Sequence, residues 1–192
     1  ICSCFSLFKT SAIGAVEHFY GLFGIEPNLE VVKAGDTVIA AADIVRQGGK
    51  EAVPGAVVGY VDAYYLFEQH PRVAEACDVI LANCYPFWES CPAEFALLYM
   101  KDMYRRAQRA GGGKPVVIAE TGWPDRGSPE GGAVPSVENA LRYFLGTAQW
   151  MEEDGVEVFW FSAFDEAWKV AKEGDVGAWW GLWDKDGRPK YV

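Results

Sequence analysis

The order of apolar runs after residue 50 constrains the fold of this chain more than any other feature. Short apolar runs at 56–62, 78–86, 115–120 and 156–166 alternate with longer segments that have helical spacing. Within the runs, apolar residues follow one another instead of alternating with polar residues, which is typical of strands buried on both faces of a parallel sheet. The strand–helix order therefore predicts an α/β protein with a parallel sheet covered by helices.

Helical spacing predicts helices over 36–49, 71–77, 92–111 and 136–155. Ser136 is a suitable N-cap for the last of them, because its hydroxyl can accept a hydrogen bond from the first turn. In the helix over 92–111 the spacing favours burial of Ala96, Met100, Met103 and Ala107. In the helix over 136–155 we expect the buried side chains to be Val137, Leu141, Phe144, Leu145 and Ala148.

Two architectures fit this order, a doubly wound open sheet and a (β/α)8 barrel. No glycine-rich phosphate loop follows any predicted strand, which disfavours a nucleotide-dependent α/β enzyme. The carboxyl ends of the predicted strands carry polar and acidic residues, namely Asp62, Asn83, Tyr85, Glu120, Asp165 and Glu166. In a barrel the active site is assembled at that end. The sequence therefore predicts a (β/α)8 TIM-type barrel.

The N-terminal quarter of the chain fits this prediction least well. A complete barrel takes at least about 200 residues, and this chain has 192. Two explanations remain open: the first part holds compressed units without a readable pattern, or the beginning of the barrel is missing or atypical. We expect a single catalytic domain over 1–192, within which 1–29 show no strand pattern.

Charge and cysteine content exclude several classes of function. The net charge of −10 argues against nucleic acid, whose binding surfaces are basic. No apolar run reaches the roughly 18 residues that span a membrane. With two histidines and no Cys-x-x-Cys pair we expect no metal site and no cofactor. The cysteines are either small buried hydrophobes or, for Cys84 and Cys91 in a secreted chain, a disulfide.

Glu120 ends an apolar run and is followed by Gly-Trp-Pro. A carboxylate at a strand end, facing a second carboxylate across a barrel mouth, is the arrangement that glycoside hydrolysis needs. The eight tryptophans supply rings that can stack on sugars. Taken alone, Glu120 could equally be a solvated surface acid.

Four motifs in the same order resemble glycoside hydrolase family 17, which contains β-1,3-glucanases and β-1,3-glucanosyltransferases. They are "DVILANCYPFWES", "KPVVIAETGWP", "FWFSAFDEAWK" and "WGLWDKDGRPKY". The resemblance extends over about residues 56–192. It implies a retaining (β/α)8 barrel enzyme that needs no cofactor.

The resemblance implies a set of site residues at matching positions. Glu120 corresponds to the nucleophile, with Tyr85 near it and Asn83 lining the cleft. Trp123 would offer a ring for a sugar to stack on. Three further positions match the eighth-strand pattern and are expected near the substrate, namely Phe164, Glu166 and Lys169. The alternative for the last two is a surface ion pair of little energetic weight.

The general acid/base is implied at Glu30, since the residues after it match the family while those before it do not. Glu26 is a second candidate. Either Glu30 is the acid on an altered loop, or the front of the barrel differs and Glu30 has no catalytic geometry. Without an acid, hydrolysis would be severely impaired, because the alkoxide leaving group needs a proton.

The predicted function is retaining hydrolysis of β-1,3-glucan by double displacement. Two alternatives remain: a β-1,3-glucanosyltransferase and a catalytically silent glucan-binding barrel. The expected partner is β-glucan polysaccharide or oligosaccharide, the expected state is a monomer, and nucleic acid is not expected. Because polymeric glucan lies outside the cytoplasm, we expect a secreted or cell-envelope protein.

Overall fold

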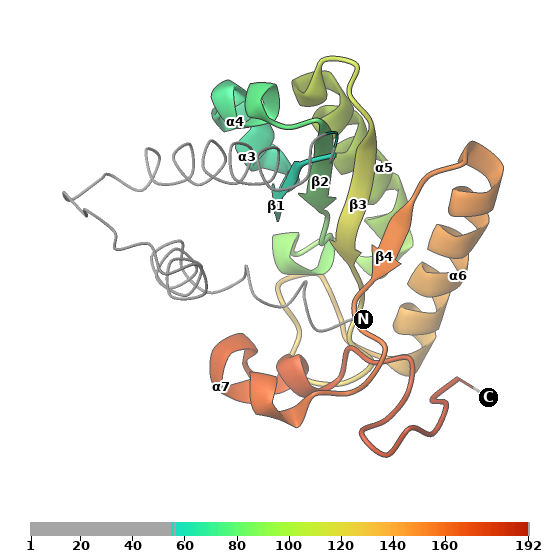
Figure 1. The fold of residues 1–192 in the computed structure, drawn as a ribbon. Helices are drawn as coiled ribbons and strands as arrows, with labels where there is room; N and C mark the ends of the chain where they lie inside the picture. Colours follow the sequence, from blue (N-terminus) through green and yellow to red (C-terminus); the bar gives the residue numbers. More distant parts are fainter. Residues whose placement is uncertain (1–54, 56, 192) are drawn as a thin grey trace, which may run out of the picture.

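Four parallel strands form the sheet at the centre of the molecule. The computed structural model describes residues 55 and 57–191, and the strands lie in the order in which they follow in the chain. Each neighbouring pair is parallel (Figure 1). The strands are β1 (Gly59–Ala63), β2 (Val79–Asn83), β3 (Val116–Thr121) and β4 (Val158–Trp160). Each predicted run contains one of them, which confirms the predicted parallel sheet.

Helices connect the strands, as the strand–helix order predicts. Between β1 and β2 lie α3 (Tyr64–Gln69), which sequence reasoning missed, and α4 (Pro71–Ala76). The short helix η2 (Phe87–Glu89) and α5 (Ala93–Gly111) follow β2, and α6 (Val137–Asp154) follows β3. After β4 come η3 (Ala167–Lys169), α7 (Val170–Glu173) and η4 (Asp175–Ala178). The helix predicted over 36–49 lies outside the described residues.

One face of the sheet is buried under α5. Ile80 and Ala82 of β2 and Ile118 of β3 are fully buried, and α5 packs on both strands (Figure 1). The residues predicted for the inner side of α5 are all buried, namely Ala96, Met100, Met103 and Ala107. On the other face of the sheet the described residues leave Leu81 and Val117 only partly buried.

The buried face of α6 differs from the predicted one. Ser136 caps the helix as predicted, and its hydroxyl oxygen accepts a hydrogen bond from the Asn139 N–H at 3.0 Å. The predicted face is wrong, because Val137 and Leu145 are 49% and 56% exposed. The buried side chains are instead Ala140, Tyr143, Thr147 and Trp150. Tyr143 can be buried here because its hydroxyl forms a hydrogen bond with the Thr121 hydroxyl, 2.7 Å away.

The structure also bears on the cysteines and on membrane-spanning helices. Cys77, Cys84 and Cys91 are free thiols, so the disulfide between Cys84 and Cys91 is not formed. Cys84 is fully buried like a small hydrophobe, and burial raises the pKa of its thiol. No helix in the described part of the chain has both the length and the apolar character that crossing a bilayer requires.

Candidate active site

A cavity of about 540 Å³ opens at the carboxyl end of the sheet. It lies beside the ends of β1, β2 and β3, and η2 and α7 complete its wall. Three predicted site residues meet here, namely Asn83, Tyr85 and Glu120. The cavity is also lined by residues outside the predicted set, among them Asp62, Trp88, Glu89, Lys172 and Glu173.

An irregularity in β3 turns Glu120 toward this cavity. Ala82 pairs with Ile118, but the next residue, Asn83, pairs with Glu120, so Ala119 is left over. Such a bulge shifts the alternation of side chains by one position. Ile118 and Thr121 are both buried on the helix side, and Glu120 lies beside Asn83 in the cavity wall.

Tyr85 holds the carboxylate of Glu120. Its hydroxyl donates a hydrogen bond to Glu120 Oε2 at 2.9 Å. Burial raises the pKa of Tyr85 well above its ordinary value, and the nearby Glu120 charge acts in the same direction. The phenol therefore stays protonated and remains a donor. The rings of Phe161 and Trp180 meet Tyr85 edge to face and fix its position.

Asn83 presents an acceptor to the cavity. It is the last residue of β2, and its Oδ1 is buried without a hydrogen-bond partner among the residues that the structure describes. A buried acceptor normally has a partner. A ligand hydroxyl in the cavity could supply the donor.

Glu166 and Lys169 form the predicted ion pair, between Lys169 Nζ and Glu166 Oε2. The alternative of a surface pair does not hold, because Lys169 is 4% exposed. Its ammonium group lies 3.8 Å from the centre of the Phe161 ring, which in turn packs on Tyr85. Neither Glu166 nor Lys169 is among the residues that line the cavity.

Phe164 also lies away from the cavity lining. Its side chain is 51% exposed, and its ring packs against Trp183 with centroids 5.9 Å apart. The hydroxyl of Ser162 donates a hydrogen bond to the Phe164 carbonyl at 2.8 Å. The structure therefore places Phe164 on a surface beside β4, outside the group formed by Asn83, Tyr85 and Glu120.

The prediction that Trp123 offers a ring to a sugar is wrong. Trp123 is 1% exposed, and its indole N–H donates to the Val134 carbonyl at 3.1 Å. The residue before it, Gly122, packs closely against the segment after β4, since a Cβ there would lie 2.0 Å from the Phe161 carbonyl oxygen. The tryptophan that does line the cavity is Trp88, in η2 after β2.

Glu89 is a second cavity residue that sequence reasoning missed. Its Oε2 accepts hydrogen bonds from the hydroxyls of Tyr64, at 3.2 Å, and of Tyr99. Arg106 of α5 continues this network to Tyr64 and to Glu68 of α3. The available signal was position, because the loop after a strand that ends in polar residues is where barrel sites are built.

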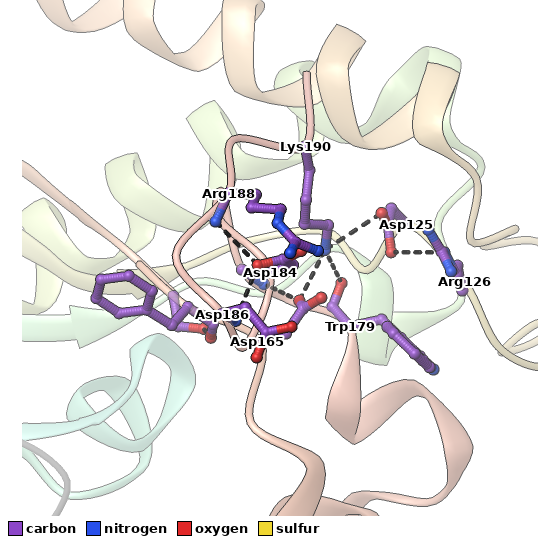
Figure 2. Close-up of polar contacts among 11 residues, drawn as sticks. Asp125, Arg126, Asp165, Trp179, Asp184, Asp186, Arg188 and Lys190 are labelled. Atoms are coloured by element: carbon purple, nitrogen blue, oxygen red, sulfur yellow. Dashed lines mark hydrogen bonds and ion pairs between the residues drawn. The ribbon is translucent and has the colours of Figure 1, made fainter. Parts of the chain in front are cut away.

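Asp165, which the sequence places at a strand end, belongs to a buried ion cluster and not to the cavity. Figure 2 shows Lys190 Nζ between two carboxylates, 2.7 Å from Asp165 Oδ1 and 3.2 Å from Asp125 Oδ2. Burial raises the pKa of Asp125, and Lys190 opposes this rise. The cluster joins the segments after β3 and β4 to the C-terminal segment.

Two further predictions concern the general acid/base and a metal site. Glu30 and Glu26, the candidates for the acid, lie outside the described residues. Among the residues that the structure describes, no group of three or more His, Cys, Asp or Glu side chains could hold a metal ion.

Barrel enzymes build their active sites at the carboxyl edge of the parallel sheet, and glycoside hydrolases use carboxylates such as Glu120 there. Residues 24–181 match the family described as the BtgE/BtgC glycoside hydrolase domain. The chain belongs to this family, within glycoside hydrolase family 17.

Curated relatives include fungal glucosidases and a fungal cell surface protein. The chain is 31% identical over 169 residues to the glucan 1,3-beta-glucosidase of Saccharomyces cerevisiae, an alignment that covers 83% of this chain and 54% of the relative. It is 28% identical over 162 residues to the cell surface mannoprotein MP65 of Candida albicans, which covers 80% of this chain and 42% of the relative. The chain thus spans about half the length of these relatives.

Solved structures agree with the predicted barrel. The glycoside hydrolase family 17 beta-1,3-glucanosyltransferase from Rhizomucor miehei matches with a TM-score of 0.74 and 29% identity, over 93% of this chain and 68% of that chain. An active-site mutant of the Rhizomucor miehei enzyme in complex with laminaritriose matches with a TM-score of 0.73 and 28% identity, over 93% and 68% of the two chains. The TIM-barrel fold is confirmed, and the described residues supply four consecutive strands of it.

Proposed function

We propose that this chain is a retaining glycoside hydrolase that cleaves β-1,3-glucan by double displacement, with Glu120 as nucleophile. The observation that carries the proposal is the bulge that turns Glu120 into the cavity, where the Tyr85 hydroxyl holds its carboxylate. The names of the relatives support the linkage of the substrate.

In the first step Glu120 attacks the anomeric carbon while an acid protonates the departing sugar oxygen, giving a glycosyl-enzyme. In the second step water attacks the anomeric carbon, the bond to Glu120 breaks and frees its carboxylate, and the residue that served as acid accepts the proton of the water. Tyr85 keeps the carboxylate in one orientation through both steps, and its raised pKa keeps the proton on the phenol.

Glu30 is proposed as the acid/base. Retention with a covalent intermediate requires its carboxyl group to lie about 5–5.5 Å from that of Glu120. The proposal is supported by the match of the residues that follow Glu30 to the family motif. A separation of about 9 Å or more between the two carboxyl groups would contradict this assignment.

Substrate contacts are proposed for the residues that line or flank the cavity. Asn83 offers its unpaired acceptor to a sugar hydroxyl, and Trp88 offers its indole ring. Phe164, Glu166 and Lys169 would act at the edge of the site, the ion pair through its packing on Phe161. We further propose a single-domain monomer that works in the cell envelope or outside the cell, as the surface relative suggests.

Hydrolysis of laminari-oligosaccharides tests the nucleophile. Glu120→Gln keeps the size and the acceptor oxygen but removes the attacking charge, so we expect turnover to fall by more than about a thousandfold. Release of reducing ends, followed alongside the thermal unfolding midpoint, measures this. Glu153→Gln, an exposed acid of α6, is the matched control and should keep full activity. Retained turnover in Glu120→Gln would exclude Glu120 as nucleophile.

Transfer of glucan to a sugar acceptor is the second candidate, favoured by the likeness to a glucanosyltransferase. It differs only in the second step, where a sugar hydroxyl replaces water. Products longer than the laminari-oligosaccharide supplied would establish transfer. Binding of the oligosaccharide without any release of reducing ends would instead identify a silent glucan-binding barrel.

A further inference from the structure

Trp168 is the most exposed tryptophan in the described part of the chain, at 62%. The other strongly exposed one, Trp183, packs its ring on Phe164. The Trp168 ring meets no other ring among the residues that the structure describes, and its neighbour is the ammonium group of Lys169. A single exposed apolar side chain is ordinary by itself. The position of Trp168 is what marks it as a candidate for function.

Trp168 lies at the rim of the cavity that holds Glu120. It belongs to η3, which runs directly into α7, because Val170 ends the first helix and begins the second. Residues four apart on a helix are neighbours on the same face. Lys172 is four residues after Trp168 and lines the cavity. Ala167 and Val170, on the opposite face of this segment, line a separate cavity beside the C-terminal segment.

Lys169 anchors the segment that carries Trp168. Its side chain is buried and pairs with Glu166. Its ammonium group lies 3.8 Å from the centre of the Phe161 ring and 5.2 Å from the centre of the Trp168 ring. The Phe161 ring packs in turn on Tyr85, whose hydroxyl holds the nucleophile candidate. The exposed indole therefore projects from a fixed base close to the reacting group.

An exposed indole at the rim of such a cavity suits a sugar chain. The hydroxyls of a glucosyl unit surround its ring and stay in water, while the C–H groups leave an apolar face. An aromatic ring can cover this face and remove it from water. A tryptophan loses little conformational freedom when it does so. A polymeric β-1,3-glucan is longer than the cavity, so its units must cross the rim.

We propose that Trp168 forms a glucan subsite outside the cavity, where its indole ring stacks on a glucosyl unit of a chain whose reacting unit lies against Glu120. This inference rests on the proposed function. The subsite acts through binding alone. It distinguishes long glucans from short ones, because only a long chain reaches from Glu120 past the rim to Trp168.

Binding of laminari-oligosaccharides to the Glu120→Gln background, measured by isothermal titration calorimetry without turnover, tests the inference. We expect Trp168→Ala to weaken binding of laminarihexaose by about tenfold, because a ring contact and its buried apolar area are lost. Binding of laminaribiose, which is too short to extend past the rim, should stay unchanged. Leu145→Ala removes an exposed apolar side chain of α6 outside the cavity lining. It is the matched control and should bind both sugars as the background does.

Two further variants separate stacking from cover of Lys169. Trp168→Leu keeps apolar atoms over the ammonium group but has no flat face, so it should lose laminarihexaose binding as Trp168→Ala does. Trp168→Phe keeps a flat face and should retain most of the binding. An equal loss for laminaribiose and laminarihexaose would show that Trp168 only supports the cavity, and it would overturn the inference, as would unchanged binding of laminarihexaose.

Oxidation of exposed indoles by N-bromosuccinimide, located by peptide mass spectrometry, tests the subsite without a change at Trp168. In the Glu120→Gln background laminarihexaose should protect Trp168, while laminaribiose should not. If Trp168→Ala does not fold, this measurement decides, and oxidation of Trp168 at the same rate with and without laminarihexaose overturns the inference.

The failure of this inference can be told from the failure of the proposed function. If the unaltered chain cleaves laminari-oligosaccharides and Trp168→Ala binds laminarihexaose as tightly as its background, only the role of Trp168 is wrong. If the unaltered chain neither binds nor cleaves them, the proposed function is wrong and the subsite falls with it.

Discussion

Tyr85 shows how one side chain can fix the orientation of a neighbouring carboxylate. It comes two residues after the end of β2, yet its hydroxyl reaches Glu120 of β3 at 2.9 Å. The Tyr85 ring packs edge to face on Phe161 and Trp180, and the ammonium group of the buried Lys169 lies over Phe161. The position of the Tyr85 hydroxyl, and with it the hydrogen bond to Glu120, thus depends on this aromatic packing.

Tyr85→Phe should lower kcat by about tenfold to a hundredfold with little change in KM, because one hydrogen bond to the nucleophile is lost while the ring packing stays. Initial rates on laminaripentaose measure both constants. Tyr104→Phe on α5, remote from the cavity, is the control. A higher KM with an unchanged kcat would show that Tyr85 contacts substrate instead of Glu120.

Trp123 and Trp88 show that residue type and position in the sequence do not determine which tryptophan lines the cavity. Both are tryptophans that follow the end of a strand within five positions. Trp123 is buried because Val134 accepts its N–H and Phe87 and Tyr143 cover its ring. Which tryptophan lines the cavity is decided only when segments that are distant in the sequence pack against these rings.

At the scale of elements, β3 carries the decisive irregularity. A regular strand would turn Glu120 to the same side as Ile118, toward the helices. The extra residue, Ala119, reverses this, and Thr121 takes the helix-facing place instead. The hydroxyls of Thr121 and Tyr143 meet at 2.7 Å, and the Tyr143 hydroxyl also contacts the Met100 sulfur at 2.8 Å. This buried contact with α5 and α6 secures the end of β3.

Tyr143→Phe should destabilise the protein by about 1–2 kcal/mol, because the Thr121 hydroxyl is then left buried with only a sulfur partner. Urea unfolding measures the free energy. Adding Thr121→Val removes the other hydroxyl, so the double variant should lose less than the sum of the two single losses. Additive losses would mean that the two hydroxyls do not stabilise each other.

Sequence reasoning predicted α5 better than α6. The buried side of α5 consists of alanines and methionines, whose spacing is readable without a partner. The buried side of α6 includes Tyr143 and Thr147, while Val137 and Leu145 face outward. A buried polar atom normally needs a hydrogen-bond partner. The partner of the Tyr143 hydroxyl is Thr121, 22 residues away in the chain. Spacing alone cannot reveal such a partner.

At the scale of the whole molecule, the ion pairs of Lys190 attach the C-terminal segment to the rest of the fold. The segment 184–190 returns to the loops after β3 and β4, where Lys190 pairs with Asp125 and Asp165 (Figure 2). The side chains of Lys190, Asp125 and Asp165 are buried, and Asp165 also accepts from the Gly181 N–H at 2.9 Å. Each partner depends on the others, because an unpaired buried charge is costly.

Lys190→Met should destabilise the chain by about 3–5 kcal/mol, since it removes the cation between two buried carboxylates and leaves Asp125 with Arg126 alone, whose Nε is 3.8 Å away. The loss should depend on pH. The pKa of Asp125 is already raised by burial, and without Lys190 it rises further. Its folded state then binds more protons than the unfolded state, so stability falls as pH rises through the interval between the two pKa values.

Urea unfolding at pH 5 and pH 8 should therefore show a larger gap between Lys190→Met and the unaltered chain at pH 8. Lys185→Met, whose pair with Asp186 is exposed, is the control and should change stability by less than about 1 kcal/mol at either pH. A gap for Lys190→Met that is equal at both pH values would show that the buried carboxylates do not carry the loss.

The sequence by itself determined the parallel sheet, the order of its strands, the carboxylate at the end of β3 and the family. These rest on local signals: unbroken apolar runs, helical spacing, caps and short motifs. Only the tertiary structure decided that Glu120 turns into the cavity, that Trp88 and not Trp123 lines it, and that Lys190 lies between Asp125 and Asp165. The physical reason is the same in each case, because each depends on the register, burial or charge of residues that meet only after distant segments pack together.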